Sequence, residues 1–235
     1  MKNPAIPTLR PFGGMFYAEW LYTVRNWKQL AFSYGLALFF GIQALIGLGG
    51  KEIFSFPIFV LLFIQAQRAT ARINEDLYRD TGTIYLRTLI SPSQIVAAKW
   101  VVESALTLVV LAILVLIFLW GGLPVGPMAV IHLVASAVAL TAVVLAATIV
   151  LPRLSRIGMP VIIISSVPLL ALFDAIPMLE ASSYVFPWIG ALTGLTALTV
   201  GEPIAPALPA TMLAESVVFM GLAGARYKKA LLRRL

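Results

Sequence analysis

Seven long apolar stretches dominate this chain and favour a bundle of membrane helices. They are 17 to 25 residues long, and about 20 mostly apolar residues cross a hydrocarbon core about 30 Å thick. The stretches cover residues 30–49, 53–71, 101–120, 127–151, 159–178, 184–200 and 208–225. Only 11% of the residues are charged, against about 25% in soluble domains, and the mean hydropathy is +0.96. The sequence therefore predicts an all-α integral membrane protein.

The basic residues predict how many stretches cross and in which direction. If 184–200 stays on the outer side and the other six cross, every lysine and arginine except Lys51 lies on the cytoplasmic side, as the positive-inside rule requires. If all seven crossed, the basic residues of the terminal RYKKALLRRL would lie outside. We therefore predict six transmembrane helices with both termini cytoplasmic. The basic residues behind the net charge of +7 are explained by their place on the cytoplasmic side. We therefore expect the lipid bilayer, and no nucleic acid, as a partner.

Residues 179–205 are predicted to form an outer hairpin between the fifth and sixth spans. The stretch SYVFPWIGALTGLTALTV contains Pro187, Gly190 and Gly194 and has no basic residue nearby. Irregular backbone is tolerated at membrane depth only where protein or a wet cavity covers it. The two glycines form a small-xxx-small pair that allows close contact between helices. We expect this segment to be re-entrant or interfacial.

Residues 12–28 are predicted to form an amphipathic helix along the cytoplasmic interface. Phe16, Trp20, Val24 and Trp27 recur at spacings of three or four, which places them on one face of a helix. The alternative is that this segment is only the polar end of the first span.

Residues 73–98 interrupt the apolar pattern between the second and third spans. Gly82 is predicted to end the helix that continues from the second span, and a short helix follows over 83–90. Ser91 and Pro92 stop that helix and begin the next one, with Ser91 as N-cap and Gln94 completing a capping box. A short helix held between two membrane helices is suited to receive force from a soluble partner; a solvated loop on the headgroups is the alternative.

The run EDLYRDTGTIYLRTLISPSQIVAAKW resembles the cytoplasmic insert of type-2 ABC transporter permeases. That insert combines an acidic residue, a Gly-Thr pair, a short Leu-x-x-Leu coupling helix, a Ser-Pro stop and an entry to the third span that ends in lysine. The matching positions are Glu75 or Asp76, Gly82, Thr83, Leu86, Leu89, Ser91, Pro92 and Ile95 through Lys99. Arg87 stands where the family pattern has glutamate. The likeness extends over essentially the whole chain and is greatest to the heme-exporter (CcmB-type) permeases of cytochrome c maturation.

The resemblance implies that 1–235 is a single permease domain of an export complex in the bacterial cytoplasmic (inner) membrane. A separate ATPase subunit would drive it, and a second copy or a related permease subunit would pair with it. The implied ATPase-coupling residues are Gly82, Thr83, Leu86, Arg87, Leu89, Ser91 and Pro92. Heme would be the substrate, with ATP bound by the partner and no cofactor on the chain itself. Another substrate (lipid, polysaccharide or drug) and a non-transporting membrane assembly subunit are the alternatives.

The sequence lacks the motifs that would make this chain an enzyme. No G-x-x-x-x-G-K-[ST] phosphate loop occurs, and the nearest candidate, ending at Lys51, has Leu45 where the first glycine belongs. The chain has no cysteine and one histidine, and H-E-x-x-H and G-x-S-x-G are both absent. We expect no catalytic residue and no metal site, and ATP hydrolysis on another chain.

Two intramembrane residues are candidates for the substrate path. His132 lies near the outer end of the fourth span, where it either binds heme or hydrogen-bonds a neighbouring helix. Glu215 lies 11 residues before Arg226, or roughly 16 Å into the last span. An ionised group at such depth costs about 2.5–3.5 kcal/mol and usually faces protein or water, so a buried structural partner is the alternative. Glu103 follows Lys99 by four residues, which predicts a local ion pair.

Overall fold

The computed structural model describes residues 11–46, 55–78, 90–122, 125–151, 183–184, 187–200 and 203–232. Within these ranges every regular element is a helix. The helices are α1 (Pro11–Arg25), α2 (Trp27–Leu45), α3 (Ser55–Tyr78), α5 (Pro92–Trp120), α6 (Pro127–Val150), α10 (Pro187–Val200) and α11 (Ala207–Leu232). The prediction of an all-α chain is confirmed for the part that the structure describes.

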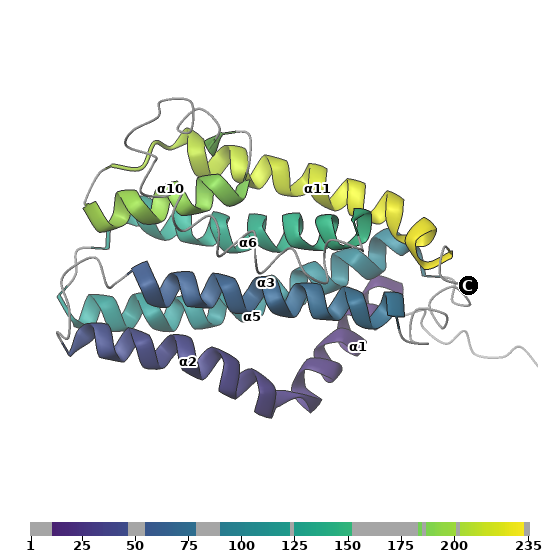
Figure 1. Cartoon of the computed structure of the whole chain (residues 1–235), viewed down its shortest axis with the longest axis horizontal. Coiled ribbons are helices and arrows are strands. Elements are labelled where there is room, and N and C mark those ends of the chain that lie inside the picture. The colour runs from purple at the N-terminus through teal and green to yellow at the C-terminus, as the bar shows by residue number, and fades with distance from the viewer. Residues whose placement is uncertain are drawn as a thin grey trace, which may run out of the picture.

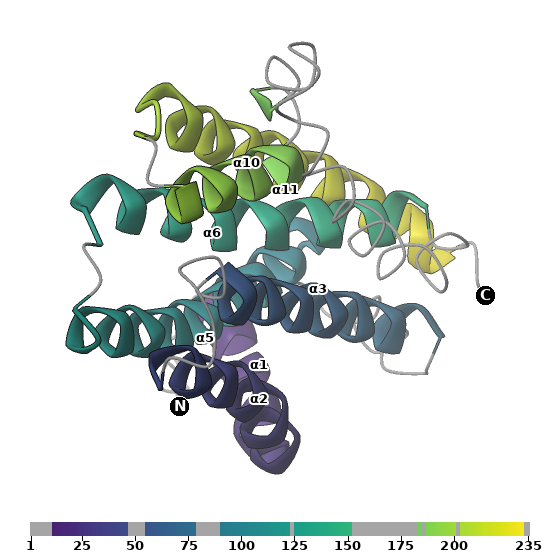
Figure 2. The ribbon, with the colours of Figure 1, turned by 60° about the vertical axis from the view of Figure 1, so that its left-hand side comes forward.

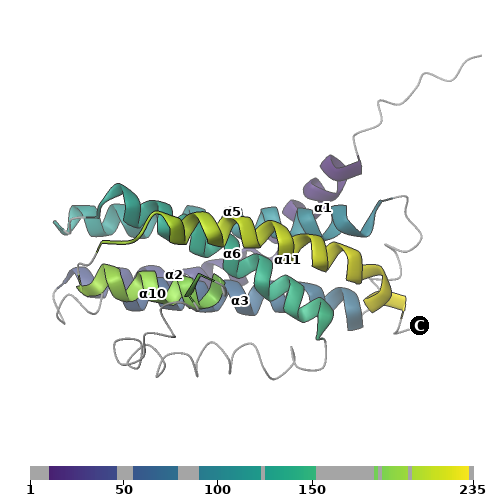
Figure 3. The same cartoon turned by 90° about the horizontal axis from the view of Figure 1, so that it is seen from above.

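The long helices run side by side along one axis (Figure 1). α2 lies on one flank, α3 and α5 follow, α6 occupies the centre, and α10 and α11 cover the opposite flank (Figures 1 and 2). Seen from above, α6 runs obliquely to its neighbours (Figure 3). Most α6 side chains are buried, and many of them are alanines, which lets the surrounding helices approach closely.

Among the described residues, three helices are long and apolar enough to cross a membrane: α5, α6 and α11, with 29, 24 and 26 residues. Their positions agree with the predicted spans 101–120, 127–151 and 208–225. The protein is therefore embedded in a membrane. α2 and α3 are helices where the first two spans were predicted, whereas the predicted fifth span, 159–178, lies outside the described residues, so the number of six spans stays a prediction.

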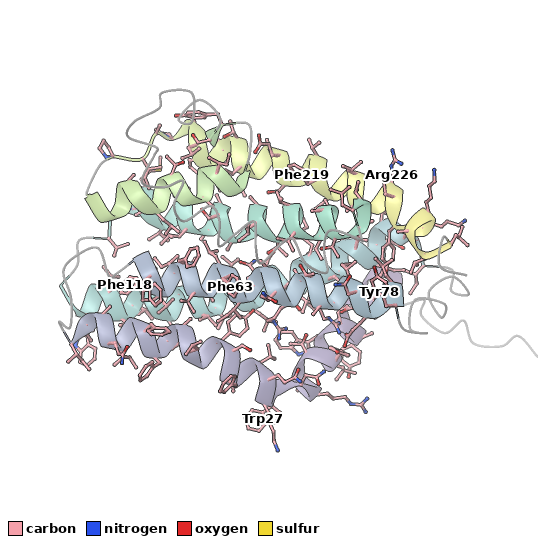
Figure 4. The ribbon with its side chains drawn as sticks, viewed as in Figure 1. Trp27, Phe63, Tyr78, Phe118, Phe219 and Arg226 are labelled. Atoms are coloured by element: carbon pink, nitrogen blue, oxygen red, sulfur yellow. The ribbon has the colours of Figure 1, made fainter. Side chains whose placement is uncertain are left out.

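α1 leaves the bundle at a corner and exposes its aromatic face. The backbone turns at Asn26, whose side-chain amide donates to the Tyr22 carbonyl at 3.0 Å, and α2 begins at the next residue (Figure 1). Trp20 and Trp27 are exposed, and Trp27 projects from the corner (Figure 4). The helix predicted over 12–28 is thus present but ends three residues earlier, and its place at a membrane interface stays a prediction.

α10 is a short helix that packs on α6. It has 14 residues, fewer than the 20 or so that a span needs. This length is in keeping with the exclusion of 184–200 from the predicted spans. The position of the hairpin on the outer side of the membrane stays a prediction.

Candidate functional site

The two ends of the bundle differ in chemistry. Tyr78, at the end of α3, and Arg226, in the last turns of α11, lie at one end, and Phe118 lies at the other (Figure 4). The predicted coupling residues Gly82, Thr83, Leu86, Arg87 and Leu89 lie outside the described residues. The structure does describe both ends of the insert, where α3 ends at Tyr78 and where α5 begins after Ser91. These two points are called the attachments of the insert.

The attachment at Ser91 is confirmed as a capped helix start. The Ser91 hydroxyl accepts from the Gln94 amide at 3.3 Å, and the Gln94 side chain accepts from the Ser91 amide at 3.1 Å. Pro92 occupies the first position of α5, where its missing N–H costs nothing. These reciprocal bonds fix the direction in which the chain leaves the insert.

The start of α5 is also held by α11. Gly224 packs directly on Ser93, because a Cβ placed at 224 would lie 2.9 Å from the Ser93 Cβ. A larger residue would push α11 away from the insert.

Lys99 lies at the centre of a buried group of charges beside this start, which we call the ion cluster: Glu19, Arg72, Asp76, Lys99 and Tyr227. The Lys99 ammonium contacts Glu19 Oε1 at 2.9 Å and Asp76 Oδ2 at 3.1 Å. All three residues are at most 4% exposed. One cation from α5 therefore joins a carboxylate of α1 to a carboxylate of α3.

Arg72 is the second cation of the ion cluster and strengthens the contact between α3 and α1. Its guanidinium pairs with Glu19 and lies over the Tyr22 ring, 3.5 Å from the centroid. Arg72 also contacts Glu75 at 3.5 Å, and the Tyr22 hydroxyl donates to Glu75 at 2.7 Å. α1 is thus tied to α3 at two successive turns.

Tyr227 brings α11 into the ion cluster. Its hydroxyl donates to Asp76 Oδ2 at 2.5 Å, and the ring is fully buried. Four helices meet at this point: α1, α3, α5 and α11.

A separate ion pair lies one turn deeper between α3 and α5. Arg68 donates to Glu103 through Nε and Nη2, both at 3.1 Å, which is the bidentate geometry of a strong pair. The Arg68 guanidinium also lies 5.5 Å from the Tyr34 ring centroid of α2. This pair joins α3 to α5 without involving α1.

The two carboxylates that share Lys99 have pKa values shifted in opposite directions. Burial raises the pKa of Glu19, but the charges of Lys99 and Arg72 outweigh burial and hold it below its ordinary value. Burial dominates at Asp76, beyond the predicted span 53–71, and raises its pKa despite Lys99 and Tyr227. As the pH falls, Asp76 therefore binds a proton before Glu19 does.

Local spacing found only part of this site. Arg72 and Glu75 are three residues apart in α3 and do pair, as local spacing on a helix allows. Local spacing also paired Glu103 with Lys99, whereas the structure places Glu103 against Arg68 of another helix. Glu19 was not singled out as a site residue, although an acid beside the aromatic face of a membrane-surface helix was a usable signal.

His132 packs against α10 at the other end of the bundle. Its ring is fully buried, and its Nε2 lies 3.2 Å from the Ser136 hydroxyl and 3.4 Å from the Ala191 carbonyl. A Cβ at Gly194 would collide with the imidazole ring. These contacts support the hydrogen-bonding interpretation of His132, and they show that Gly194 permits the close contact predicted for this segment.

Glu215 lies on the border between the buried and exposed faces of α11. Its Oε2 is buried without a hydrogen-bond partner among the described residues, while the neighbouring Val217 and Val218 are exposed. The structure does not bring Glu215 and His132 together in one group, and the role of Glu215 in a substrate path stays a prediction.

The ion cluster joins four helices through side-chain contacts. Within the described ranges, no three histidine, aspartate or glutamate side chains gather in a way that could hold a metal ion. Comparison of the chain with protein-family models, with curated proteins and with solved structures gives no match.

Proposed function

We propose that the protein is the permease subunit of a type-2 ABC export complex in the bacterial inner membrane, with cytoplasmic termini and an ATPase on a separate chain. The observation that carries the proposal is the ion cluster, which joins α3 and α5 at the base of the insert to α1 and α11. A soluble partner that pushed the insert would move these helices as one unit.

The dimensions of the helices suit this role. α5 has 29 residues, about 44 Å at 1.5 Å per residue, so it spans the whole membrane as one rod. A displacement at its capped start is carried along its length. The order of elements, with an N-terminal amphipathic helix, an insert after the second predicted span and a short helix before the last, also supports the family resemblance.

Docking of the insert on an ATPase subunit is tested by co-purification from the native host. We expect Arg87→Asp combined with Leu89→Asp to abolish recovery of the ATPase while the chain still inserts into the membrane, because a charge reversal and an acid on the apolar face of the predicted 83–90 helix oppose docking. Lys28→Asp, an exposed charge reversal near the start of α2, is the control. Equal recovery of the ATPase with the unmodified chain, the double variant and Lys28→Asp would refute docking through the insert.

For the substrate, we propose heme, exported for cytochrome c maturation by a pair of permease subunits. The support is the likeness of the insert to the heme-exporter permeases, and His132 and Glu215 are the candidate path residues. Deletion in the native host separates the alternatives: loss of c-type cytochromes supports heme, an altered surface polymer or lipid supports another substrate, and no transport defect supports an assembly subunit.

A further inference from the structure

We propose that Lys99 is the positioning residue that makes α1 move with the base of the insert. Its ammonium joins Glu19 of α1 to Asp76 of α3. This inference rests on the proposed function, because it assigns α1 a part in the movement that an ATPase would drive.

The contact lies where the insert is attached. Asp76 is two residues before the last residue of α3, and Lys99 is seven residues after the first residue of α5, about 10 Å along the helix. A displacement of either attachment therefore reaches Lys99 with little intervening chain to absorb it.

α1 meets the bundle through few buried side chains. Among the described side chains of residues 13–25, only Met15, Glu19 and Thr23 are buried, and their spacing of four residues places them on one narrow stripe. Glu19 is the charged member of this stripe, and it meets two cations. Charge pairing therefore holds the middle of this stripe against α3 and α5, beside the apolar contact of Met15 with the core.

Lys99 is the cation that Glu19 and Asp76 share. Without its ammonium, Glu19 and Asp76 would be two buried carboxylates facing one another, and like charges in low dielectric repel strongly. Glu19→Gln is the milder change, since Lys99 then keeps Asp76 and Arg72 keeps Glu75.

Spin-label distances measure the position of α1 directly. The sequence has no cysteine, so Tyr17→Cys on α1 and Val109→Cys on α5, each 62% exposed, give one labelled pair in the full chain. We expect a narrow distance distribution in the unmodified background, a broad one with Lys99→Met or Glu19→Gln, and a narrow one again with Lys99→Arg.

The deeper ion pair supplies a matched control. Arg68→Met combined with Glu103→Gln removes a buried pair between α3 and α5 that does not contact α1. We expect the α1–α5 distribution to stay narrow in this double variant. Equal broadening in the control, or a narrow distribution in both Lys99→Met and Glu19→Gln, would overturn the proposal.

Coupling is measured in the complex with the ATPase. We expect magnesium, ATP and vanadate to leave the α1–α5 distance unchanged in the unmodified complex and in Lys99→Arg, because α1 moves with α5, and to shift it in Glu19→Gln although the ATPase still co-purifies. A distance that also stays unchanged in Glu19→Gln would reduce the ion cluster to a purely structural role. Failure of the proposed function would show differently, as absence of an ATPase partner from the unmodified chain.

Discussion

The two ends of the bundle bury polar groups in opposite ways. At the end that carries the insert, four helices meet through charged side chains, with Lys99 between Glu19 and Asp76. At the other end, α6 and α10 meet through small residues, with His132 packed on Gly194. The first contact is specified by charge and the second by the absence of a side chain.

This difference has a mechanical consequence. An ion pair is directional, and breaking it leaves an uncompensated buried charge. A contact through glycine has no such alternative state and simply limits how near two helices can lie. We therefore expect the charged end to respond to a partner and the glycine-packed end to stay fixed.

Removing the charge at the first end has the largest expected effect. Lys99→Met leaves Glu19 and Asp76 without their shared cation, and removal of one partner from a buried pair costs about 3–5 kcal/mol. Circular dichroism during titration with a denaturing detergent measures the loss in the free energy of unfolding. Lys99→Arg is the control and should retain most of the stability; equal losses would show that packing, not charge, holds this end together.

Filling the glycine contact at the second end is expected to cost less. Gly194→Ala forces the new methyl group against His132, and overpacking typically costs about 1–3 kcal/mol. Gly221→Ala in α11 is the matched control, because nothing lies within 4 Å of the added Cβ, and alanine favours the helix by about 1 kcal/mol. The same unfolding assay checks both. If Gly194→Ala left the free energy of unfolding unchanged, the contact of α6 with α10 would not depend on the missing side chain at Gly194.

The capped start of α5 is expected to contribute a smaller amount. Ser91→Ala removes the acceptor for the Gln94 amide, and loss of such a cap costs about 1 kcal/mol. Ser91→Asn, which can also cap, should restore the stability. A loss of several kcal/mol would indicate that Ser91 has a further contact within the insert.

The smallest expected effect is in the pH dependence of stability at the charged end. The pKa shifts of Glu19 and Asp76 change the free energy of unfolding in opposite directions. Glu19, with its lowered pKa, contributes stability that is present above about pH 4.5 and is lost as the pH falls through its folded pKa. Asp76, with its raised pKa, carries a cost of ionisation that disappears as the pH falls through its folded pKa. Unfolding measured from neutral to acidic pH should therefore show a small gain before the loss.

Two variants separate these two effects. Asp76→Asn should remove the gain and leave the loss, and Glu19→Gln should remove the loss. A monotonic profile in the unmodified chain that neither variant alters would show that these carboxylates do not titrate in opposite directions.

The sequence predicted what depends on periodicity and local spacing. The apolar stretches 101–120, 127–151 and 208–225 coincide with most of α5, α6 and α11, and Ser91-Pro92 with Gln94 predicted the start of α5 to the residue. The glycine spacing in 184–200 correctly indicated a close helix contact, because a missing side chain permits such contact whichever partner arrives.

Long-range charge pairing could not be predicted in the same way. Glu19 and Lys99 are 80 residues apart, and spacing along one helix assigns a charge only to partners in its own turns. Lys99 had a plausible local partner in Glu103, and only the packing of α3 on α5 assigns Glu103 to Arg68. The position of α1 against α5 was the missing information.

The hydrogen bond between Tyr227 and Asp76 also sets an order of assembly. It joins residues 151 positions apart, so it forms only after the last helix has been synthesised and inserted. Until then Asp76 lacks the donor that Tyr227 supplies from α11. Closure of the ion cluster therefore belongs to the final step of folding, and a chain cut short before residue 227 would leave the site that faces the insert unfinished.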